Sequence, residues 1–514
     1  MIFSIRFSLL ARLLPVMVAV GPMHAMDAVV PQPVAGKRPA RDGKLSLRDV
    51  VRWTLERNPL LDVRREAVNE ARAGELETQA AFDPEVTANL GGAGSREAAA
   101  TSELDGSSQP ENSSVTGGAA IAKPTRDGST IGLRWDTLDR SKTNSSFSSL
   151  NPSYDSALRL TLRKPLMKGS GKEILLPEEF ARLASIRTVQ QWRAEIEATL
   201  LQVETAYWEI EARRRGTGIR HQGLAVARLL LEETVARGSS KVEVLEARAN
   251  VVRREAEVAQ AAKEFRDAVD RVFLLAGVLG EYEPGQLVFD TLPGVDGRVP
   301  DAGEAYADAI RNGVDARMEE NALARANMDV ERARYGLRPT LDLAASGGLL
   351  GRDGSYAGAN SALANGDGRY IEAGVELSFP WDLRAERARL KQAESRLQQE
   401  RSRIDNARGE LFARLRELSR RVTLGQELLR AASTAVELNQ ARFDEQRARR
   451  TAGEAILRDV LEAQTALDES RVAELRARLD ATAARLELEA ARGRLPARHG
   501  LQLDLRVSSP PASL

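Results

Sequence analysis

The sequence contains no cysteine and only three histidines. Disulfides, thiolate chemistry, cysteine-based zinc sites and a lipid-modified N-terminal cysteine are therefore excluded. Aromatic residues make up only 4% of the chain, too few for a dense aromatic core. Basic and acidic residues balance at 74 each, so no excess positive charge favours nucleic acid. With 29% charged residues, the composition is that of long, solvated helices.

Long hydrophobic runs are also missing, apart from one near the N-terminus. Residues 1–25 contain Arg6 and Arg12, then the apolar stretch Leu13–Val20, and then a possible cleavage site after Ala25. This order is typical of a secretory signal peptide. The alternative is a membrane anchor, but the apolar stretch is shorter than the ~20 residues that a spanning helix needs. Residues 26–44, rich in proline and glycine, are predicted to be a flexible lead-in.

No pattern in the sequence predicts catalysis. His24 would leave with the signal peptide, His221 lies alone on a predicted helix and His499 lies in the predicted tail. Acidic residues show no catalytic spacing, and most have an arginine one helical turn away. The glycine cluster at 91–94 follows a strand but precedes no helix, unlike a phosphate-binding loop. We therefore expect a protein that is not an enzyme, with no catalytic, cofactor-binding or metal-binding residues.

The longest regular pattern runs from Leu383 to Phe443. Apolar residues recur every seven positions from Leu383 to Leu418, and a second such series runs from Leu415 to Phe443. A strict seven-residue repeat predicts a helix that supercoils against a partner helix. At about 1.5 Å per residue, a helix of ~60 residues is roughly 90 Å long. It must pack against helices of similar length, in its own chain or in copies of it.

Four segments alternate apolar and polar residues, which predicts strands. A strand of about ten such positions spans a hydrocarbon layer when it is tilted. A fifth segment, about 112–140, alternates more weakly and predicts either an external hairpin or two further strands. The four expected strands lie at about 84–93, 153–164, 339–347 and 369–380.

The order of elements occurs twice, which indicates an internal duplication. Each unit has helices, two strands, a long helix, a tight turn and a return helix. Gly238 and Gly453 interrupt the helical patterns and are predicted to lie at hairpin tips, with the second turn longer than the first. The predicted parts are a first repeat at 45–282, a linker at 283–302, a second repeat at 303–493 and a disordered tail at 494–514.

Four strands cannot close a barrel, because the smallest membrane barrels have eight. Lipid-exposed strands must nevertheless have all their backbone groups paired. Several copies of the chain must therefore form one ring. Aromatic residues near the predicted strand ends favour this membrane barrel over a soluble sheet on a stalk. These candidate membrane-interface residues are Trp135, Tyr154, Tyr370, Phe379 and Trp381.

With these elements in order, the sequence resembles the TolC-type outer-membrane efflux proteins from about Leu45 to Gly493. No single motif decides this, but the doubled order of motifs is specific. The motifs are Leu45-Ser46-Leu47 through Asn58-Pro59, the strand exits Lys164-Pro165-Leu166-Met167 and Phe379-Pro380, Arg237-Gly238 followed by Val242-Glu243-Val244-Leu245-Glu246-Ala247, and Gly453 followed by Arg458-Asp459-Val460-Leu461-Glu462-Ala463-Gln464.

This resemblance implies an α+β membrane protein in which a homotrimer forms a 12-stranded transmembrane β-barrel. The barrel would continue into a long periplasmic α-helical coiled-coil barrel, placing the protein in the outer membrane with most of its mass in the periplasm. The implied function is a passive exit duct of a tripartite efflux or type I secretion system, fed by a periplasmic adaptor and an inner-membrane pump. A non-conducting periplasmic scaffold or tether is the alternative, and a cytoplasmic coiled-coil protein is the third hypothesis.

The resemblance also implies roles for residues at the hairpin tips. Asp459 and Glu462 lie three residues apart, hence on one helix face, and would line the narrowest part of the pore together with Glu243. Ordinary solvated helix charge is the alternative explanation for these acidic residues. The candidate adaptor-contacting residues are Arg237, Gly238, Ser239, Arg450 and Gly453.

Overall fold

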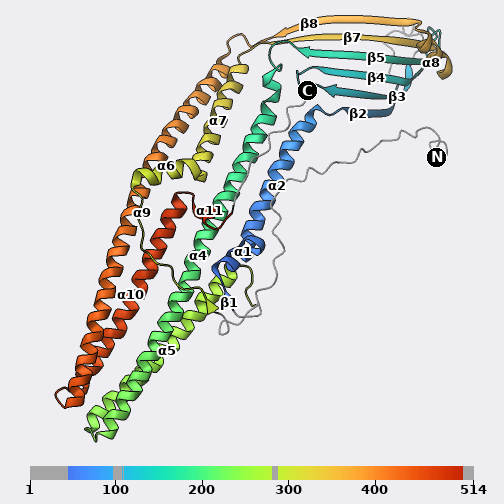
Figure 1. The fold of residues 1–514 in the computed structure, drawn as a ribbon. Coiled ribbons are helices and arrows are strands. Elements are labelled where there is room, and N and C mark those ends of the chain that lie inside the picture. Colours follow the sequence, from blue (N-terminus) through green and yellow to red (C-terminus); the bar gives the residue numbers. More distant parts are fainter. Residues whose placement is uncertain (1–43, 97–106, 108, 281–287, 502–514) are drawn as a thin grey trace, which may run out of the picture. The chain divides into compact units, whose positions relative to one another are not determined.

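The computed structural model describes residues 44–96, 107, 109–280 and 288–501. The predicted signal peptide and all but the last residue of the predicted lead-in lie outside the described residues. The described chain contains an antiparallel six-stranded sheet and two long helical hairpins (Figure 1).

The sheet has the strand order β2-β3-β4-β5-β7-β8. Strands lie at the four positions expected from the sequence, and segment 112–140 supplies two more inside the same sheet. Of the two alternatives left open for segment 112–140, the structure therefore confirms two further strands, which gives this chain six strands in one sheet. The strands are β2 (Glu85–Arg96), β3 (Glu111–Pro124), β4 (Thr130–Thr143), β5 (Ser153–Pro165), β7 (Thr340–Asp353) and β8 (Gly368–Ser378).

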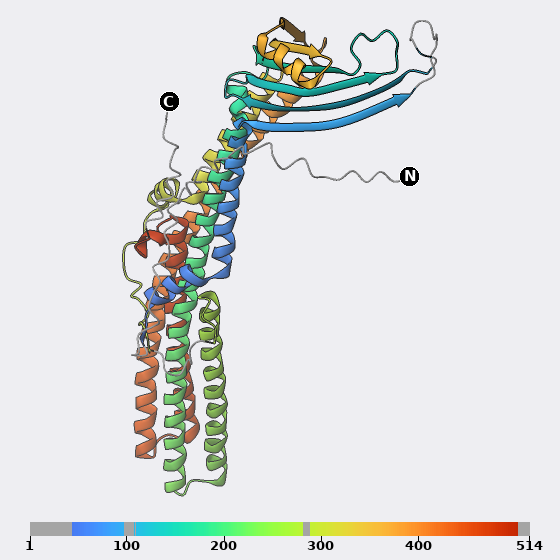
Figure 2. The same ribbon diagram turned by 90° about the vertical axis from the view of Figure 1, so that its right-hand side faces the viewer.

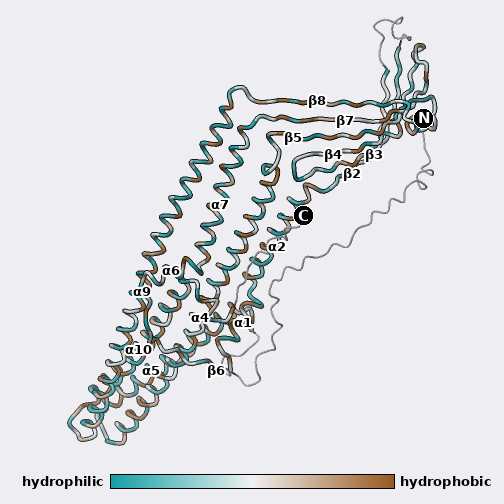
Figure 3. Tube along the Cα trace, turned by 45° about the horizontal axis from the view of Figure 1, so that its top comes forward, coloured by the Kyte–Doolittle hydropathy of each residue, from teal (hydrophilic) through white to brown (hydrophobic). Residues whose placement is uncertain are grey.

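Residues of opposite polarity alternate along the strands, as the hydropathy colouring shows (Figure 3). In β5, Leu158, Leu160 and Leu162 lie on one face, and Arg159 and Arg163 lie on the other. The paired positions in β4 and β7 follow the same division. The sheet therefore has one apolar and one charged face.

Two helical hairpins extend from the sheet (Figure 2). The first consists of α4 (Lys172–Ala236) and α5 (Lys241–Leu275), and the second of α9 (Arg384–Ala452) and α10 (Leu457–Ala491). At about 1.5 Å per residue, α4 and α9 are each roughly 100 Å long. Among the described helices, none is both long enough and apolar enough for a membrane crossing.

The heptad positions of α9 form its buried side. Leu415, Leu418 and Val422 pack against Ala484 and Leu488 of α10. Shorter helices occupy equivalent places in the two repeats and pack on α4 and α9. They are α1 (Leu47–Arg57), α2 (Pro59–Gln79) and the 3₁₀ turn η1 (Ala80–Phe82) in the first repeat, and α6 (Ala302–Asn312) and α7 (Val314–Tyr335) in the second.

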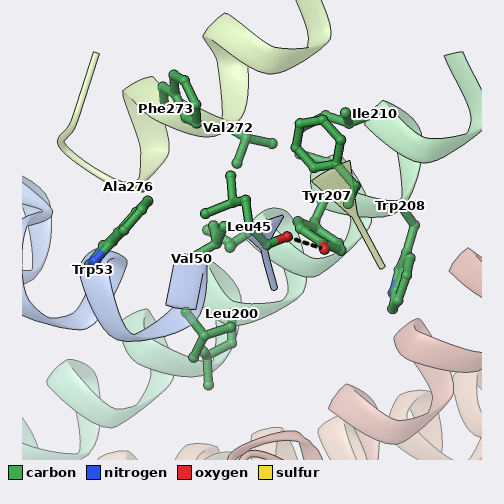
Figure 4. Close-up of a cluster of buried hydrophobic side chains, with 14 of the residues drawn as sticks. Leu45, Val50, Trp53, Leu200, Tyr207, Trp208, Ile210, Val272, Phe273 and Ala276 are labelled. Carbon is green, nitrogen blue, oxygen red and sulfur yellow. Dashed lines mark hydrogen bonds between the residues drawn. The ribbon is translucent and has the colours of Figure 1, made fainter. Parts of the chain in front are cut away.

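The largest core ties the N-terminal end of the first repeat to the segment that joins the repeats. Strand β1 (Lys44–Leu45) pairs in parallel with β6 (Val288–Phe289). Tyr207 of α4 is fully buried beside them, and its hydroxyl donates to the Leu45 carbonyl at 2.8 Å (Figure 4). The same hydroxyl accepts from the backbone N–H of Asp290 at 2.9 Å. One side chain therefore bonds to both segments that this core brings together.

Two segments differ from the sequence expectation. The segment between β7 and β8 is rich in glycine, which predicts a loop, but it contains a helix, α8 (Tyr356–Asn365), which packs on β7 and β5. The expected disordered tail begins with helix α11 (Leu495–Arg498), whose Leu495 is fully buried. His499 lies 2.9 Å from the buried carboxylate of Glu204, so burial and a polar partner order this part. Residues 502–514 lie outside the described residues.

We predict that Tyr207→Phe lowers the free energy of unfolding by about 1–3 kcal/mol, because it removes both hydrogen bonds of the buried hydroxyl. Thermal unfolding followed by circular dichroism measures the change. Tyr306→Phe is the matched control, since that hydroxyl has no hydrogen bond to the described residues and the ring only packs edge-on against Phe412. Equal melting temperatures for the two variants would contradict the role given to the Tyr207 hydroxyl.

Candidate gate at the tips of the helical hairpins

Glycine ends the long helix of each hairpin. Gly238 follows α4 with φ +67° and Gly453 follows α9 with φ +83°, the left-handed region in which a side chain is strained. The next residues, Ser239 and Glu454, donate their N–H groups back to carbonyls of the last helical turn. The turns are Arg237–Ser240 and Gly453–Ile456, so they have equal length, which corrects the expectation of a longer second turn.

A buried arginine joins the two tips. Arg450 of α9 is only 6% exposed, and its Nη2 donates to the Thr234 hydroxyl of α4 at 3.0 Å. Arg237 donates in return to the Arg450 carbonyl at 2.8 Å. Burial lowers the pKa of the Arg450 guanidinium, an effect that nearby Glu243 opposes and Arg237 reinforces. We call Thr234, Arg237 and Arg450 the tip latch.

The other polar contacts between the tips are more exposed. Arg447 lies 3.5 Å from Glu233, and Arg458 lies 3.5 Å from Glu246. Exposed ion pairs of this kind each stabilise the folded state by about 0–1 kcal/mol. The tip latch is therefore the strongest polar contact between the two tips of one chain, and it is lost when the tips separate.

The acidic candidates lie beside the latch. Asp459 and Glu462 are in the first two turns of α10, half-exposed and exposed respectively. Between them, Val460 packs toward Leu230 and Phe443 in a small core. The acidic pair therefore faces away from the chain's own core. Glu243, in the first turn of α5, lies near Arg450 and has no hydrogen bond or ion pair with the acidic pair in the described structure.

A second buried polar cluster lies farther from the tips. Arg254 of α5 is 3.3 Å from Asp468 of α10, with both side chains nearly inaccessible. Gln464 donates to the carbonyl of Gly223 in α4 at 2.8 Å. A Cβ on Gly223 would lie 2.7 Å from the Asp468 carboxylate, so any larger residue there would have to displace that carboxylate. Burial raises the pKa of Asp468, opposed by Arg254. The sequence analysis missed this cluster, whose one visible signal was a glycine within a helix.

The interface aromatics are distributed differently from the expectation. Phe379 and Trp381 follow β8 directly and are exposed, Trp381 by 92%. Tyr154 is the second residue of β5. Trp135 is exposed on the apolar face, but within β4, because this strand continues to Thr143. Tyr370 pairs with Gly348 and Gly348 with Arg159, so Tyr370 lies on the charged face.

The comparison with protein families identifies this architecture. Residues 305–494, from α6 to the end of the α9–α10 hairpin, match the family described as outer membrane efflux protein. The second repeat of the chain is therefore similar to the outer membrane efflux protein family. No curated protein sequence matches the chain. The family consists of outer-membrane channels rather than enzymes.

Solved structures share the fold. A membrane protein from Pseudomonas aeruginosa aligns with a TM-score of 0.65 and 19% identity over 87% of this chain and 90% of its own. The Campylobacter jejuni CmeC outer membrane channel aligns with a TM-score of 0.63 and 13% identity, over 87% of this chain and 85% of its own. The Neisseria gonorrhoeae MtrE outer membrane channel aligns with a TM-score of 0.61 and 17% identity, over 87% of this chain and 88% of its own. The TolC-type fold of long helices and antiparallel strands is thereby confirmed.

We predict that Thr234→Val loosens the tips, because it leaves the buried Arg450 guanidinium without its hydroxyl partner. An unsatisfied buried donor lowers the free energy of separating the two tips by about 1–3 kcal/mol. Amide hydrogen exchange at residues 230–237 and 447–452 should accelerate accordingly. Thr451→Val is the matched control, since its hydroxyl also donates to the carbonyl four residues earlier but is exposed and is not the partner of the Arg450 guanidinium. Identical exchange in both variants would show that the latch does not hold the tips together.

Proposed function

We propose that three copies of this outer-membrane efflux channel assemble into an exit duct that conducts solutes passively. Its helical tips would dock a periplasmic adaptor, which in turn contacts an inner-membrane pump. The observation that carries this proposal is the two-faced sheet, which has open edges and continues directly into long helical hairpins. The hypothesis of a non-conducting scaffold gives no reason for such a sheet.

The sheet supplies the arguments for a ring. Among the described strands, β2 and β8 each have a partner on one side only. In a bilayer the unpaired edges would be costly, so further copies must pair with them. The charged face carries close ion pairs, including Arg134–Asp136 at 2.8 Å and Arg163–Asp342 at 2.6 Å. A watery lumen suits this face, and lipid suits the apolar face.

Exposed apolar side chains on the hairpins support contacts with other chains. Val242 and Leu245 at the start of α5 are 65% and 55% exposed, and Leu438 of α9 is 68% exposed. Val242 and Leu245 lie three residues apart on one helix face, and adjoining exposed apolar side chains of this kind mark interaction sites. Val242 and Leu245 follow the first tip directly, so we assign them with Arg237, Gly238 and Ser239 to the surface that meets the adaptor. Arg450 and Gly453 belong to the same end, although Arg450 acts mainly through the latch.

The assembly itself is tested in membranes. We predict that the protein fractionates with the outer membrane and that crosslinking in intact membranes gives a trimer. Cysteine pairs on β2 and β8 provide site-specific crosslinks, since the chain has no cysteine of its own. Recovery as a monomer in the periplasmic extract would favour the scaffold over the duct.

The acidic pair is the proposed constriction. Three copies of Asp459 and Glu462 would place like charges around the axis, an arrangement that water and cations stabilise. We predict that the double substitution Asp459→Asn, Glu462→Gln reduces block by multivalent cations in planar-bilayer recordings. Its effect on conductance should be larger at low salt than at high salt, because dissolved ions screen fixed charge.

The control for this measurement lies on the same helix. Glu469→Gln removes an exposed charge from α10, about 10 Å or more farther from the tip by helix rise. We expect it to leave cation block unchanged. Block identical to the parent in the double variant would assign Asp459 and Glu462 to a solvated outer face.

A further inference from the structure

The structure gives the first repeat four strands of the sheet and the second repeat two. We propose that the assembled trimer encloses an eighteen-stranded barrel whose wall includes the β3–β4 hairpin, and that its membrane passage admits solutes too bulky for a twelve-stranded one. The number follows from three copies of a six-stranded sheet. It therefore rests on the trimer of the proposed function.

Cross-strand pairing places the hairpin in the wall. One row of paired residues crosses all six strands on the apolar face, and β3 and β4 continue it without interruption. Ile121 and Leu133 are 42% and 43% exposed, so they face the surroundings as their neighbours do. A hairpin standing outside the membrane would have no reason to match this lipid-facing row. The row is Val86, Ile121, Leu133, Leu160, Gly347 and Ile371.

The adjacent row shows the opposite character. Its residues are small or polar across the same six strands, as a watery lumen requires. Farther along the same face, Arg134 and Asp136 of β4 pair with each other, and Arg159 of β5 lies 4.0 Å from Asp136. The hairpin thus contributes to both surfaces of the wall. The polar row is Glu85, Ala122, Gly132, Thr161, Ser346 and Glu372.

The hairpin also has the length of a spanning element. Strands β3 and β4 have 14 residues each, as β7 does. The turn between them lies at the end of the sheet where the chain enters the helices. There Asp127 lies 3.3 Å from Lys164, Arg126 lies 3.4 Å from Glu178 of α4, and the Arg126 guanidinium lies 5.6 Å from the ring centre of Phe82. These contacts hold the turn at the helical end of the sheet, so β3 and β4 extend over its full height.

The edges of the sheet fit closure by copies. Strand β2 has 12 residues and β8 has 11, so β8 of one copy and β2 of the next match in length. Their union pairs both open edges and gives an even number of strands, as in bacterial barrels.

Strand number sets the width. With strands about 4.8 Å apart and tilted by about 40°, eighteen strands give a backbone diameter of roughly 36 Å, and twelve give roughly 24 Å. Barrels of 16–18 strands leave an open aqueous channel. The cross-section of the membrane passage would be about twofold larger than in a twelve-stranded wall. Selection by size would then fall to the helical tips.

One experiment measures access to the lumen from outside. Ser346→Cys places a thiol on the charged face, and Ala345→Cys places one at the same depth on the apolar face of the otherwise cysteine-free chain. Maleimide-polyethylene glycols of increasing mass are added to intact cells. A comparison chain lacking residues 97–143 joins β2 to the loop before β5 and so removes the hairpin. We expect Ser346→Cys to accept larger reagents in the full chain than in the deletion, and Ala345→Cys to stay unlabelled in both.

Electron cryo-microscopy of the full-length protein in lipid nanodiscs decides the strand number even if the deletion chain fails to insert. A closed trimer with eighteen strands supports the proposal. A closed trimer with twelve strands and β3–β4 outside the wall overturns it and leaves the exit duct intact, as does an equal size limit for labelling with and without the hairpin. A protein that forms no closed trimer overturns the proposed function and this inference together.

Discussion

The pairing of backbone hydrogen bonds in lipid is the constraint on which the rest of this structure depends. An unpaired N–H or C=O in hydrocarbon costs several kilocalories per mole, so the open edges of β2 and β8 cannot both face lipid. Closure by copies satisfies them. Strand β5 leads within a few residues into α4, and β8 leads into α9. A ring of sheets therefore also arranges the hairpins in a ring, and the helical duct follows from the membrane wall.

The hairpins are held together differently along their length. Near the middle, a dense apolar core around Tyr207 and Leu200 surrounds the β1–β6 pair. Farther along, the buried polar contacts of Arg254, Asp468 and Gln464 join α4, α5 and α10. At the tips only a small core around Leu230 and the tip latch remain. Separation of the tips thus exposes little apolar surface, whereas separation near the middle would expose much. Motion is least costly where the proposed gate lies.

The sequence predicted those parts of the fold in which local pattern and burial agree. The heptads of α9 are an example, with Leu415 and Val422 at its buried face. Strands β3 and β4 remained undecided because β3 is rich in glycine, serine and alanine, which carry little alternation. Hydrogen bonds to the neighbouring strands β2 and β5 hold β3 and β4 in the sheet, and the weak alternation in the sequence does not reveal this pairing. The pairing of His499 with Glu204 joins positions far apart in sequence, so the prediction of disorder was wrong for residues 494–501, the described part of the tail.

The candidate site shows the same division. Both tip glycines were visible, because a break in a long periodic helix is a local signal. The tip latch could be predicted only in part. Arg447, Arg449 and Arg450 form one basic group in the sequence, and it takes the packing against α4 to show that Arg450 is the buried one. Tyr370 illustrates the converse, since an aromatic residue near a strand end suggested lipid while the pairing of β8 places it among charged residues. Which face a residue takes depends on register, which single residues do not specify.

An internal duplication fixes the number of helices more firmly than the number of strands. The β3–β4 hairpin begins and ends at the outer side of the sheet, so its insertion leaves the junctions of β2 with α2 and of β5 with α4 where they were. A wall widened in this way must still meet the same set of helices, and the connections between them have to absorb the difference. Those connections hold unusual backbone: Gly169 and Gly171 have φ +83° and +60° before α4, and Leu383 has φ +48° before α9. A leucine in the left-handed region costs about 1–2 kcal/mol. This strained residue lies directly at the junction of strand β8 with helix α9, where the sheet passes into the second hairpin.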